Sequence, residues 1–119
     1  MSVTQVQSTD EFKNKLKEAG NKLVVVDFYA TWCGPCRQIA PKIQAMAKEH
    51  TDVVFLTAMA KEHTDVVFLK VDVEELDDLA AEYEISCMPT FVFIKQGAKV
   101  TSFSGANADK LLELVTQNK

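Results

Sequence analysis

The sequence predicts an α/β fold with a central mixed β-sheet and helices on both faces. Segments with strand and helix patterns alternate along most of the chain. The segment Leu23–Ala30 is apolar without alternation, which is typical of a strand covered on both faces. At 119 residues the chain is long enough for one domain with a substantial core. We therefore expect a single domain over residues 1–119.

The amino-terminal part is predicted to form a strand, a helix and a second strand. Val3–Val6 has the pattern of a short first strand. Ser8 and Glu11 have the spacing of a capping box, and Gly20 is expected to end the helix that they begin. The apolar residues of this helix share one face: Phe12, Leu16 and Ala19. The strand Leu23–Ala30 follows it.

A second helix is predicted directly after this strand, where Cys33 and Cys36 lie. Its apolar positions recur at helical spacing: Ile39, Ala40, Ile43, Met46 and Ala47. Pro41 is expected to kink the helix, because its ring has no N–H for the carbonyl of Arg37. The two cysteines are therefore expected where a strand ends and a helix begins.

The carboxyl-terminal part is predicted to contain a strand, a helix, a hairpin and a last helix capped by Asn107. The strand is expected at Val66–Val73 and the helix at Glu74–Glu84. The two strands of the hairpin are expected at Thr90–Lys95 and Lys99–Phe103, with the turn at Gln96–Ala98. Inward positions of the two helices are Leu76, Leu79, Ala80 and Tyr83, then Leu111, Leu114 and Val115.

The position of Cys33 favours its thiolate, the form of cysteine that attacks disulfides. The first N–H groups of a helix lack helical partners, and the helix dipole favours negative charge at that end. Lowering a thiol pKa from ~8.5 to about 7 requires about 2 kcal/mol, and the dipole supplies between ~0.3 and ~2 kcal/mol of it. Pro35 suits the first helical turn, and Gly34 keeps the approach to Cys33 open. The spacing lets Cys36 reach that sulfur, so a reversible disulfide is predicted.

Composition and charge restrict the class of protein. Hydrophobic residues make up 47% and charged residues 25%, which is ordinary for a soluble globular domain. The net charge of −4 argues against nucleic-acid partners and against anionic membranes. No apolar run reaches membrane length, and three cysteines do not form a secreted disulfide framework. We expect a reducing cytoplasmic or nuclear location.

The middle of the chain contains a repeat. Ala45–Thr57 (AMAKEHTDVVFLT) is followed at once by Ala58–Lys70 (AMAKEHTDVVFLK), and twelve of the thirteen positions are identical. The copies differ only in Thr57 and Lys70. Two copies are too few for a solenoid, so the repeat indicates a tandem duplication within the domain.

The second copy is expected to supply the sheet strand, because Val66–Leu69 continues into the apolar residues that follow. About thirteen residues, roughly 51–63, are then surplus. They could extend the cysteine helix, loop out, or allow a strand and helix to be exchanged between two chains. The apolar residues of this segment favour a helical extension whose apolar face is buried by a second subunit.

Several motifs resemble the thioredoxin family. They are Trp32–Cys36 (WCGPC), Val26–Phe28 before it and Met88–Phe91 (MPTF) after it. Cys87 and the run Phe103–Asn107 resemble the animal cytosolic branch in particular. Removing one 13-residue copy from the 119-residue chain leaves 106 residues, and the resemblance covers these from end to end. The resemblance implies the thioredoxin fold, with the repeat as a departure within it.

The resemblance also implies roles for four residues. Cys33 would attack a substrate disulfide and form a mixed disulfide, and Cys36, the more buried cysteine, would resolve it. Asp27 would be a buried carboxylate that exchanges a proton with Cys36, since burial raises a carboxyl pKa toward neutrality. Lys70 resembles the family lysine beside this aspartate. The implied activity is protein-disulfide reduction by thiol–disulfide exchange.

A substrate surface and an electron source are implied in the same way. The residues of the surface would be Trp32, Gly34, Pro35, Met88, Pro89, Thr90, Gly105 and Ala106. The family pattern makes Met88–Pro89 a cis peptide bond. The chain would hold no cofactor itself and would receive electrons from NADPH through thioredoxin reductase. Its other partners would be proteins that contain disulfides.

Simpler interpretations stand beside these. Cys33 and Cys36 could be half of a zinc site, but His50 and His63 show no matching ligand spacing, so no metal is expected. The two histidines are copies of one residue and are expected to be solvated. Asp27 could be a structural carboxylate, although beside a dithiol the proton role is favoured.

Cys87 is expected to be a small apolar residue, with an intermolecular disulfide and a regulatory role as the alternative. A homodimer could then form through Cys87 or through the repeated segment. Two other functions remain open at this point. One is a binding module gated by the redox state of the dithiol, and the other is a swapped or oligomeric variant with weakened activity.

Overall fold

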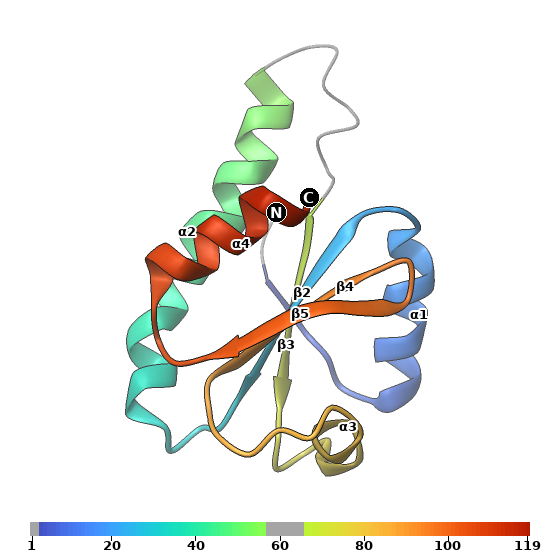
Figure 1. Cartoon of the computed structure of the whole chain (residues 1–119), viewed down its shortest axis with the longest axis vertical. Helices are drawn as coiled ribbons and strands as arrows, with labels where there is room; N and C mark the ends of the chain where they lie inside the picture. Colours follow the sequence, from blue (N-terminus) through green and yellow to red (C-terminus); the bar gives the residue numbers. More distant parts are fainter. Residues whose placement is uncertain (1–2, 57–65) are drawn as a thin grey trace.

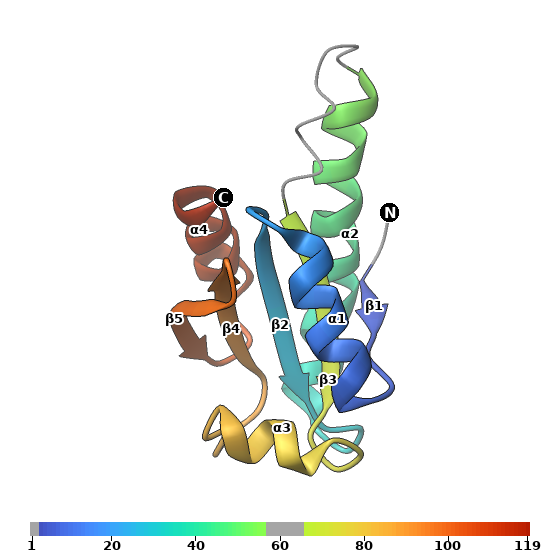
Figure 2. The ribbon, with the colours of Figure 1, turned by 90° about the vertical axis from the view of Figure 1, so that its right-hand side faces the viewer.

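The computed structural model describes residues 3–56 and 66–119, with the side chains of residues 49–56 left out. In the described part, five strands form one sheet in the order β1-β3-β2-β4-β5, and four helices pack around it (Figures 1 and 2). The strands are β1 Thr4–Gln5, β2 Leu23–Tyr29, β3 Val66–Asp72, β4 Thr90–Lys95 and β5 Ala98–Ser104. The helices are α1 Thr9–Ala19, α2 Gly34–Leu56, α3 Asp77–Glu82 and α4 Ala108–Asn118.

The sheet is mixed, as predicted. β3 runs parallel to β1 and to β2, whereas β4 is antiparallel to both β2 and β5. β2 therefore has a neighbour on each side and helices over each face, which explains why its sequence is apolar without alternation.

Two buried clusters lie on opposite faces of the sheet. Successive residues of β2 belong alternately to one cluster and the other, and Val24, Val26 and Phe28 lie in the cluster on the side of α1 and α3. Leu23 and Val25 belong to the other cluster, with α2 and α4. This alternation also places Asp27 on the α2 side of the sheet. The predicted α/β arrangement with helices on both faces of the sheet is confirmed: in Figure 1, α2 and α4 lie to the left of the strands and α1 to the right.

Local signals in the sequence set several helix ends. The Ser8 hydroxyl accepts a hydrogen bond from the N–H of Glu11, and the Glu11 carboxylate accepts one from the N–H of Gln7, which completes the predicted capping box. Asn107 caps α4 through the N–H of Lys110, and Gly20 ends α1 with a positive φ of 59°.

The predicted helix Glu74–Glu84 is wrong in extent, because α3 spans only Asp77–Glu82. Its start is delayed by a turn, in which the Asp72 carboxylate accepts the N–H of Glu74 at 2.9 Å. Its end is fixed by Glu84, whose φ is 55° and therefore not helical.

Other boundaries differ by one residue. β1 is shorter than Val3–Val6, and β2 and β3 end one residue before the predicted Ala30 and Val73. The hairpin turn has two residues, Gln96 and Gly97, with φ of 54° and 79°. Positive φ at both positions is the geometry of a tight turn that matches strand twist, so β5 starts at Ala98 and extends to Ser104.

The repeated sequence adopts two structures. The first copy continues α2 without a break to Leu56, beyond the sheet (Figure 1), whereas Val66–Lys70 of the second copy lies in β3. The predicted strand from the second copy and the helical extension from the first are confirmed. Identical residues therefore follow their tertiary surroundings rather than a local preference.

Some predictions for this region stay untested. Pro41 lies inside α2, but a kink there remains a prediction. The side chain of His50 and all of residues 57–65, including His63, lie outside the described residues. Burial of the extension by a second subunit, and the origin of the repeat by duplication, also remain predictions. No helix in the described ranges is long and apolar enough to cross a membrane.

Candidate active site

The two cysteines lie where β2 gives way to α2, as predicted. β2 ends at Tyr29, and the N–H of Cys33 donates to the carbonyl of Ala30 at 3.2 Å in the turn that follows. The N–H of Arg37 then donates to the Cys33 carbonyl at 3.2 Å as α2 begins. Cys33 therefore occupies the N-cap position of this helix.

Cys33 and Cys36 form a disulfide, with their Cα atoms 5.3 Å apart. The separation is ordinary for a disulfide and follows from their places in the first helical turn. The two residues are 6% and 5% exposed. Both are buried to nearly the same extent, so the greater burial expected for Cys36 stays a prediction.

The sulfur of Cys33 acts as the cap of α2. It accepts a hydrogen bond from the backbone N–H of Cys36 at 3.1 Å. Serine and threonine oxygens usually fill this position by accepting from the third helical residue. Pro35 has no N–H of its own, so it leaves no unpaired donor beside the sulfur. The same geometry would stabilise a thiolate on Cys33.

Asp27 is a buried carboxylate on the α2 side of β2, with 7% of its surface exposed. Burial raises its pKa from 3.8 to about 7, and the positive charge of Lys70 partly opposes this. Lys70 is the direct partner of Asp27 across the β2–β3 pair. The Asp27 Oδ1 atom has no hydrogen-bond partner within the described part of the chain.

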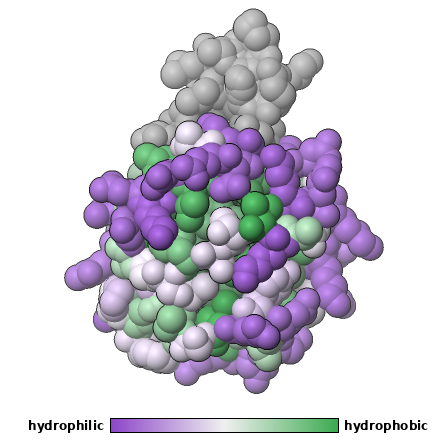
Figure 3. Space-filling view, in the orientation of Figure 1, coloured by the Kyte–Doolittle hydropathy of each residue, from purple (hydrophilic) through white to green (hydrophobic). Residues whose placement is uncertain are grey.

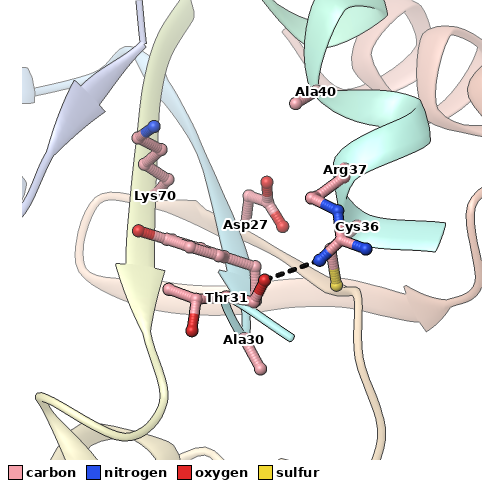
Figure 4. Close-up of a pocket in the computed structure, with 8 residues that line it drawn as sticks. Asp27, Ala30, Thr31, Cys36, Arg37, Ala40 and Lys70 are labelled. Atoms are coloured by element: carbon pink, nitrogen blue, oxygen red, sulfur yellow. Dashed lines mark hydrogen bonds between the residues drawn. The ribbon is translucent and has the colours of Figure 1, made fainter. Parts of the chain in front are cut away.

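A cavity of about 280 Å³ joins the carboxylate to the disulfide (Figure 4). Its lining residues are Asp27, Tyr29, Ala30, Thr31, Cys36, Arg37, Ala40 and Lys70. Arg37 closes one side by donating from Nη1 to the carbonyl of Thr31 at 2.8 Å, the dashed line in Figure 4. The lining is mostly apolar, with polar groups from Asp27 and Lys70, and the space is large enough to hold water.

Tyr29 is a lining residue that the sequence did not single out. The ammonium of Lys70 lies 5.6 Å from the centre of its ring, and its hydroxyl donates to Oε1 of Gln5 at 2.7 Å. The ring thus holds Lys70 in a cation–π contact beside Asp27. Only the alternation of side chains along β2 could have predicted this position.

The residues predicted to bind substrate differ in exposure. Trp32 is 63% exposed, and its indole N–H donates to Oε2 of Glu74 at 3.2 Å. Pro35 and Ala106 are exposed, Gly34, Met88 and Gly105 are partly buried, and Pro89 and Thr90 are buried. The Met88–Pro89 bond is cis, and the Met88 carbonyl lies 3.7 Å from the Cys33 sulfur.

Cys87 is exposed, as its alternative role in an intermolecular disulfide would require, and the choice between the two roles stays a prediction. Its backbone carbonyl accepts from the Thr90 hydroxyl, which also lies 2.8 Å from the Ser104 hydroxyl. The pKa of the Cys87 thiol is lowered, chiefly by a side-chain hydrogen bond between this thiol and Ser104. Ser104 is a further residue that sequence reasoning missed, because only the β4–β5 register brings it here.

Among the described side chains, no group of three or more histidines, cysteines or carboxylates could hold a metal ion. A mixed α/β sheet that presents a C-x-x-C disulfide at a helix start, next to a cis-proline loop, defines a thiol–disulfide oxidoreductase.

Comparison with known proteins gives the family. Residues 3–117 match the thioredoxin family. The chain is 49% identical to thioredoxin of Equus caballus over 109 residues, which are 92% of this chain and 91% of that protein. It is 47% identical to thioredoxin of Homo sapiens over the same shares of both chains.

Solved structures agree with this match. The chain resembles the X-ray structure of Fasciola hepatica thioredoxin with a TM-score of 0.85 and 43% identity, over 98% of this chain and 100% of that one. For thioredoxin NaTrxh from Nicotiana alata the TM-score is 0.85 and the identity 37%, over 99% and 93%. The chain belongs to the thioredoxin family and is a thiol–disulfide oxidoreductase. The redox-gated binding module and the weakened variant are not favoured.

Proposed function

We propose that the protein reduces disulfides in other proteins with electrons that thioredoxin reductase delivers from NADPH. The observation that carries this proposal is the hydrogen bond from the Cys36 N–H to the Cys33 sulfur at the start of α2. A donor fixed at a helix start stabilises negative charge on that sulfur and so keeps part of the reduced Cys33 reactive at neutral pH.

In the first step, the Cys33 thiolate attacks one sulfur of a substrate disulfide. A mixed disulfide forms, and the other substrate sulfur leaves as a thiolate and takes a proton. In the second step, Cys36 loses its proton and attacks the sulfur of Cys33. The second substrate thiol leaves, and the Cys33–Cys36 disulfide of the described structure forms. Two electrons and two protons have then passed to the substrate.

Asp27 is proposed to accept the proton of Cys36. Both residues line the 280 Å³ cavity, so water in that space could carry the proton between them. The raised pKa of about 7 lets the carboxyl group take up and release a proton near neutrality. Lys70 would restrain this rise, since its charge favours the ionised carboxylate.

The exposed residues around Cys33 are proposed to dock the substrate. Trp32, Pro35 and Ala106 offer apolar surface, and Met88 presents a carbonyl beside the sulfur. Gly34 and Gly105 have open space where a Cβ would be, so a substrate backbone could approach closely. Pro89 and Thr90 are buried and would shape this surface from below.

A cytoplasmic or nuclear location is proposed from the use of cysteine, since the site works only where it is kept reduced. A homodimer through Cys87 or through the repeated segment is a further proposal. Light scattering of the protein with and without reductant would test it, since a disulfide dimer would separate on reduction.

Reduction of insulin, coupled to NADPH oxidation by thioredoxin reductase, tests the function. The wild type and Cys87→Ser should both reduce insulin catalytically, whereas Cys33→Ser should lose activity. Cys36→Ser should accumulate a mixed disulfide with the substrate, because nothing resolves it. Equal rates for the wild type and Cys33→Ser would overturn the proposal.

A further inference from the structure

The loop 87–89 lies next to the disulfide, and its three carbonyl groups have different partners. The carbonyl of Cys87 accepts from the Thr90 hydroxyl at 2.6 Å. The carbonyl of Pro89 accepts from the N–H of Gly105 at 2.9 Å. The carbonyl between them, that of Met88, instead lies beside the active-site sulfur. The peptide group before Met88 and the peptide group after Pro89 are therefore each held by a hydrogen bond.

Both fixing contacts depend on the end of β5. Gly105 follows that strand directly and supplies its N–H. Ser104, the last residue of β5, is the register partner of Thr90, and their hydroxyl oxygens are 2.8 Å apart. The end of β5 therefore holds the loop 87–89 through two contacts: Gly105 binds the carbonyl of Pro89, and Ser104 binds Thr90.

The number of hydroxyl protons decides which residue donates in the contact between Ser104 and Thr90. A carbonyl oxygen only accepts hydrogen bonds, so Thr90 must donate its single hydroxyl proton to the carbonyl of Cys87. In the contact between the two hydroxyl groups, Ser104 is then the donor. The chain of hydrogen bonds runs from Ser104 to Thr90 to Cys87. Thr90 is buried, so its hydroxyl has little access to water as a replacement donor.

We propose that Ser104 is a positioning residue for substrate disulfides: through Thr90 it fixes the carbonyl of Cys87 and so holds the Met88 carbonyl beside Cys33. This inference rests on the proposed docking of substrate at Met88. Ser104 touches neither the disulfide nor the substrate. Its removal should therefore weaken the docking of a protein substrate and leave the chemistry at Cys33 unchanged.

The test measures KM and kcat for insulin reduction in Ser104→Ala, Ser104→Thr and Thr90→Val. Ser104 is exposed, so its truncation removes no core contact. One lost neutral hydrogen bond should raise KM about threefold in Ser104→Ala, and Thr90→Val should raise it about tenfold because a carbonyl loses its partner. Ser104→Thr keeps a hydroxyl and should restore the wild-type KM. In all variants kcat should stay within about twofold.

A matched control and a small substrate separate docking from general damage. Ser102→Ala removes the same group two residues earlier on β5, opposite Val92, which has no hydroxyl. It should leave KM unchanged. A small aromatic disulfide makes little use of the loop, so its rate of reduction should be the same for the wild type and for Ser104→Ala.

The double variant Ser104→Ala/Thr90→Val tests whether Ser104 acts through Thr90. If it does, KM in the double variant should equal that of Thr90→Val alone, whereas independent effects would multiply to about thirtyfold. An unchanged KM in Ser104→Ala, or multiplying effects, would overturn the inference even if the wild type reduces insulin normally. Failure of the wild type to reduce insulin would instead contradict the proposed function. If Thr90→Val does not fold, the KM values of Ser104→Ala and Ser104→Thr still decide whether the hydroxyl group of Ser104 supports docking.

Discussion

Lys70 lies directly opposite Asp27 in the register of β2 and β3, and both residues line the cavity that reaches Cys36. Burial raises the pKa of Asp27 to about 7, and Lys70 is the charge that opposes it. The relationship links the only difference between the two copies of the repeat to the active site, because the first copy has Thr57 where the second has Lys70.

Lys70→Met should raise the pKa of Asp27 above 7, since the cation that favours the carboxylate is lost. The change can be followed by NMR titration of the Asp27 carboxyl carbon in the oxidised protein. Lys99→Met is the control, because Lys99 is exposed on β5, two strands away from β2. A pKa that stays at its wild-type value in Lys70→Met would show that Lys70 does not act on Asp27.

Removing one copy of the repeat provides a matched pair of chains. Deletion of residues 45–57 or of residues 58–70 leaves chains that differ at one position, with Lys70 or Thr57 before Val71. We expect both to fold, because the remaining copy completes α2 and β3. The chain with Lys70 should reduce insulin within about twofold of the full-length rate.

The chain with Thr57 should have the higher Asp27 pKa of the two. If the chain that keeps Lys70 loses activity by more than about tenfold, the surplus residues take part in function. That outcome would contradict the assignment of the site to the described residues.

Asp27→Asn should stabilise the oxidised protein at pH 8 and not at pH 4. The folded pKa is about 7 and the ordinary value is 3.8, so between these values the folded state binds more protons than the unfolded chain. Stability conferred by the protonated carboxyl is therefore lost as pH rises from about 4 to about 7. Asparagine cannot ionise, so Asp27→Asn does not lose this stability. Above pH 7 its free energy of unfolding should exceed that of the wild type by at most about 4 kcal/mol.

Urea unfolding of the wild type and Asp27→Asn at several pH values measures the difference. The gap between the two proteins should open between pH 4 and pH 7 and then stay constant. A constant gap at every pH would mean that Asp27 ionises normally in the folded protein.

Glu74→Ala should loosen the Trp32 side chain, because its indole N–H loses the partner at 3.2 Å. Trp32 is the single tryptophan of the chain, so its fluorescence anisotropy reports on this residue alone. We expect a lower anisotropy in Glu74→Ala and the wild-type value in the control Glu75→Ala, which changes a neighbouring exposed carboxylate. The stability should change by less than about 1 kcal/mol, since the hydrogen bond is exposed. Equal anisotropy in the two variants would show that the hydrogen bond does not restrain Trp32.

Local signals explain why much of the fold was predictable. The capping box at Ser8 and the unbroken apolar run of β2 each have a short-range physical cause that can be read from neighbouring residues. The position of Cys33 and Cys36 follows from the same kind of signal, because a strand and a helix meet there.

Contacts between distant segments were not predictable. Trp32 and Glu74 are 42 residues apart, and the pairing of Ser104 with Thr90 depends on a two-residue turn whose exact length the pattern did not show. The exposure of Cys87 was left open for the same reason. Its exposure depends on the path of the loop before β4, and the apolar character of a thiol says nothing about that path.

The central claim is that Cys33 becomes a reactive thiolate because it caps α2. The most direct test is the pH dependence of alkylation of Cys33 in reduced Cys87→Ser protein, with the modified residue identified by mass spectrometry. We expect half-maximal reactivity near pH 7, well below the ~8.5 of a free cysteine. A midpoint at or above ~8.5 would contradict the claim.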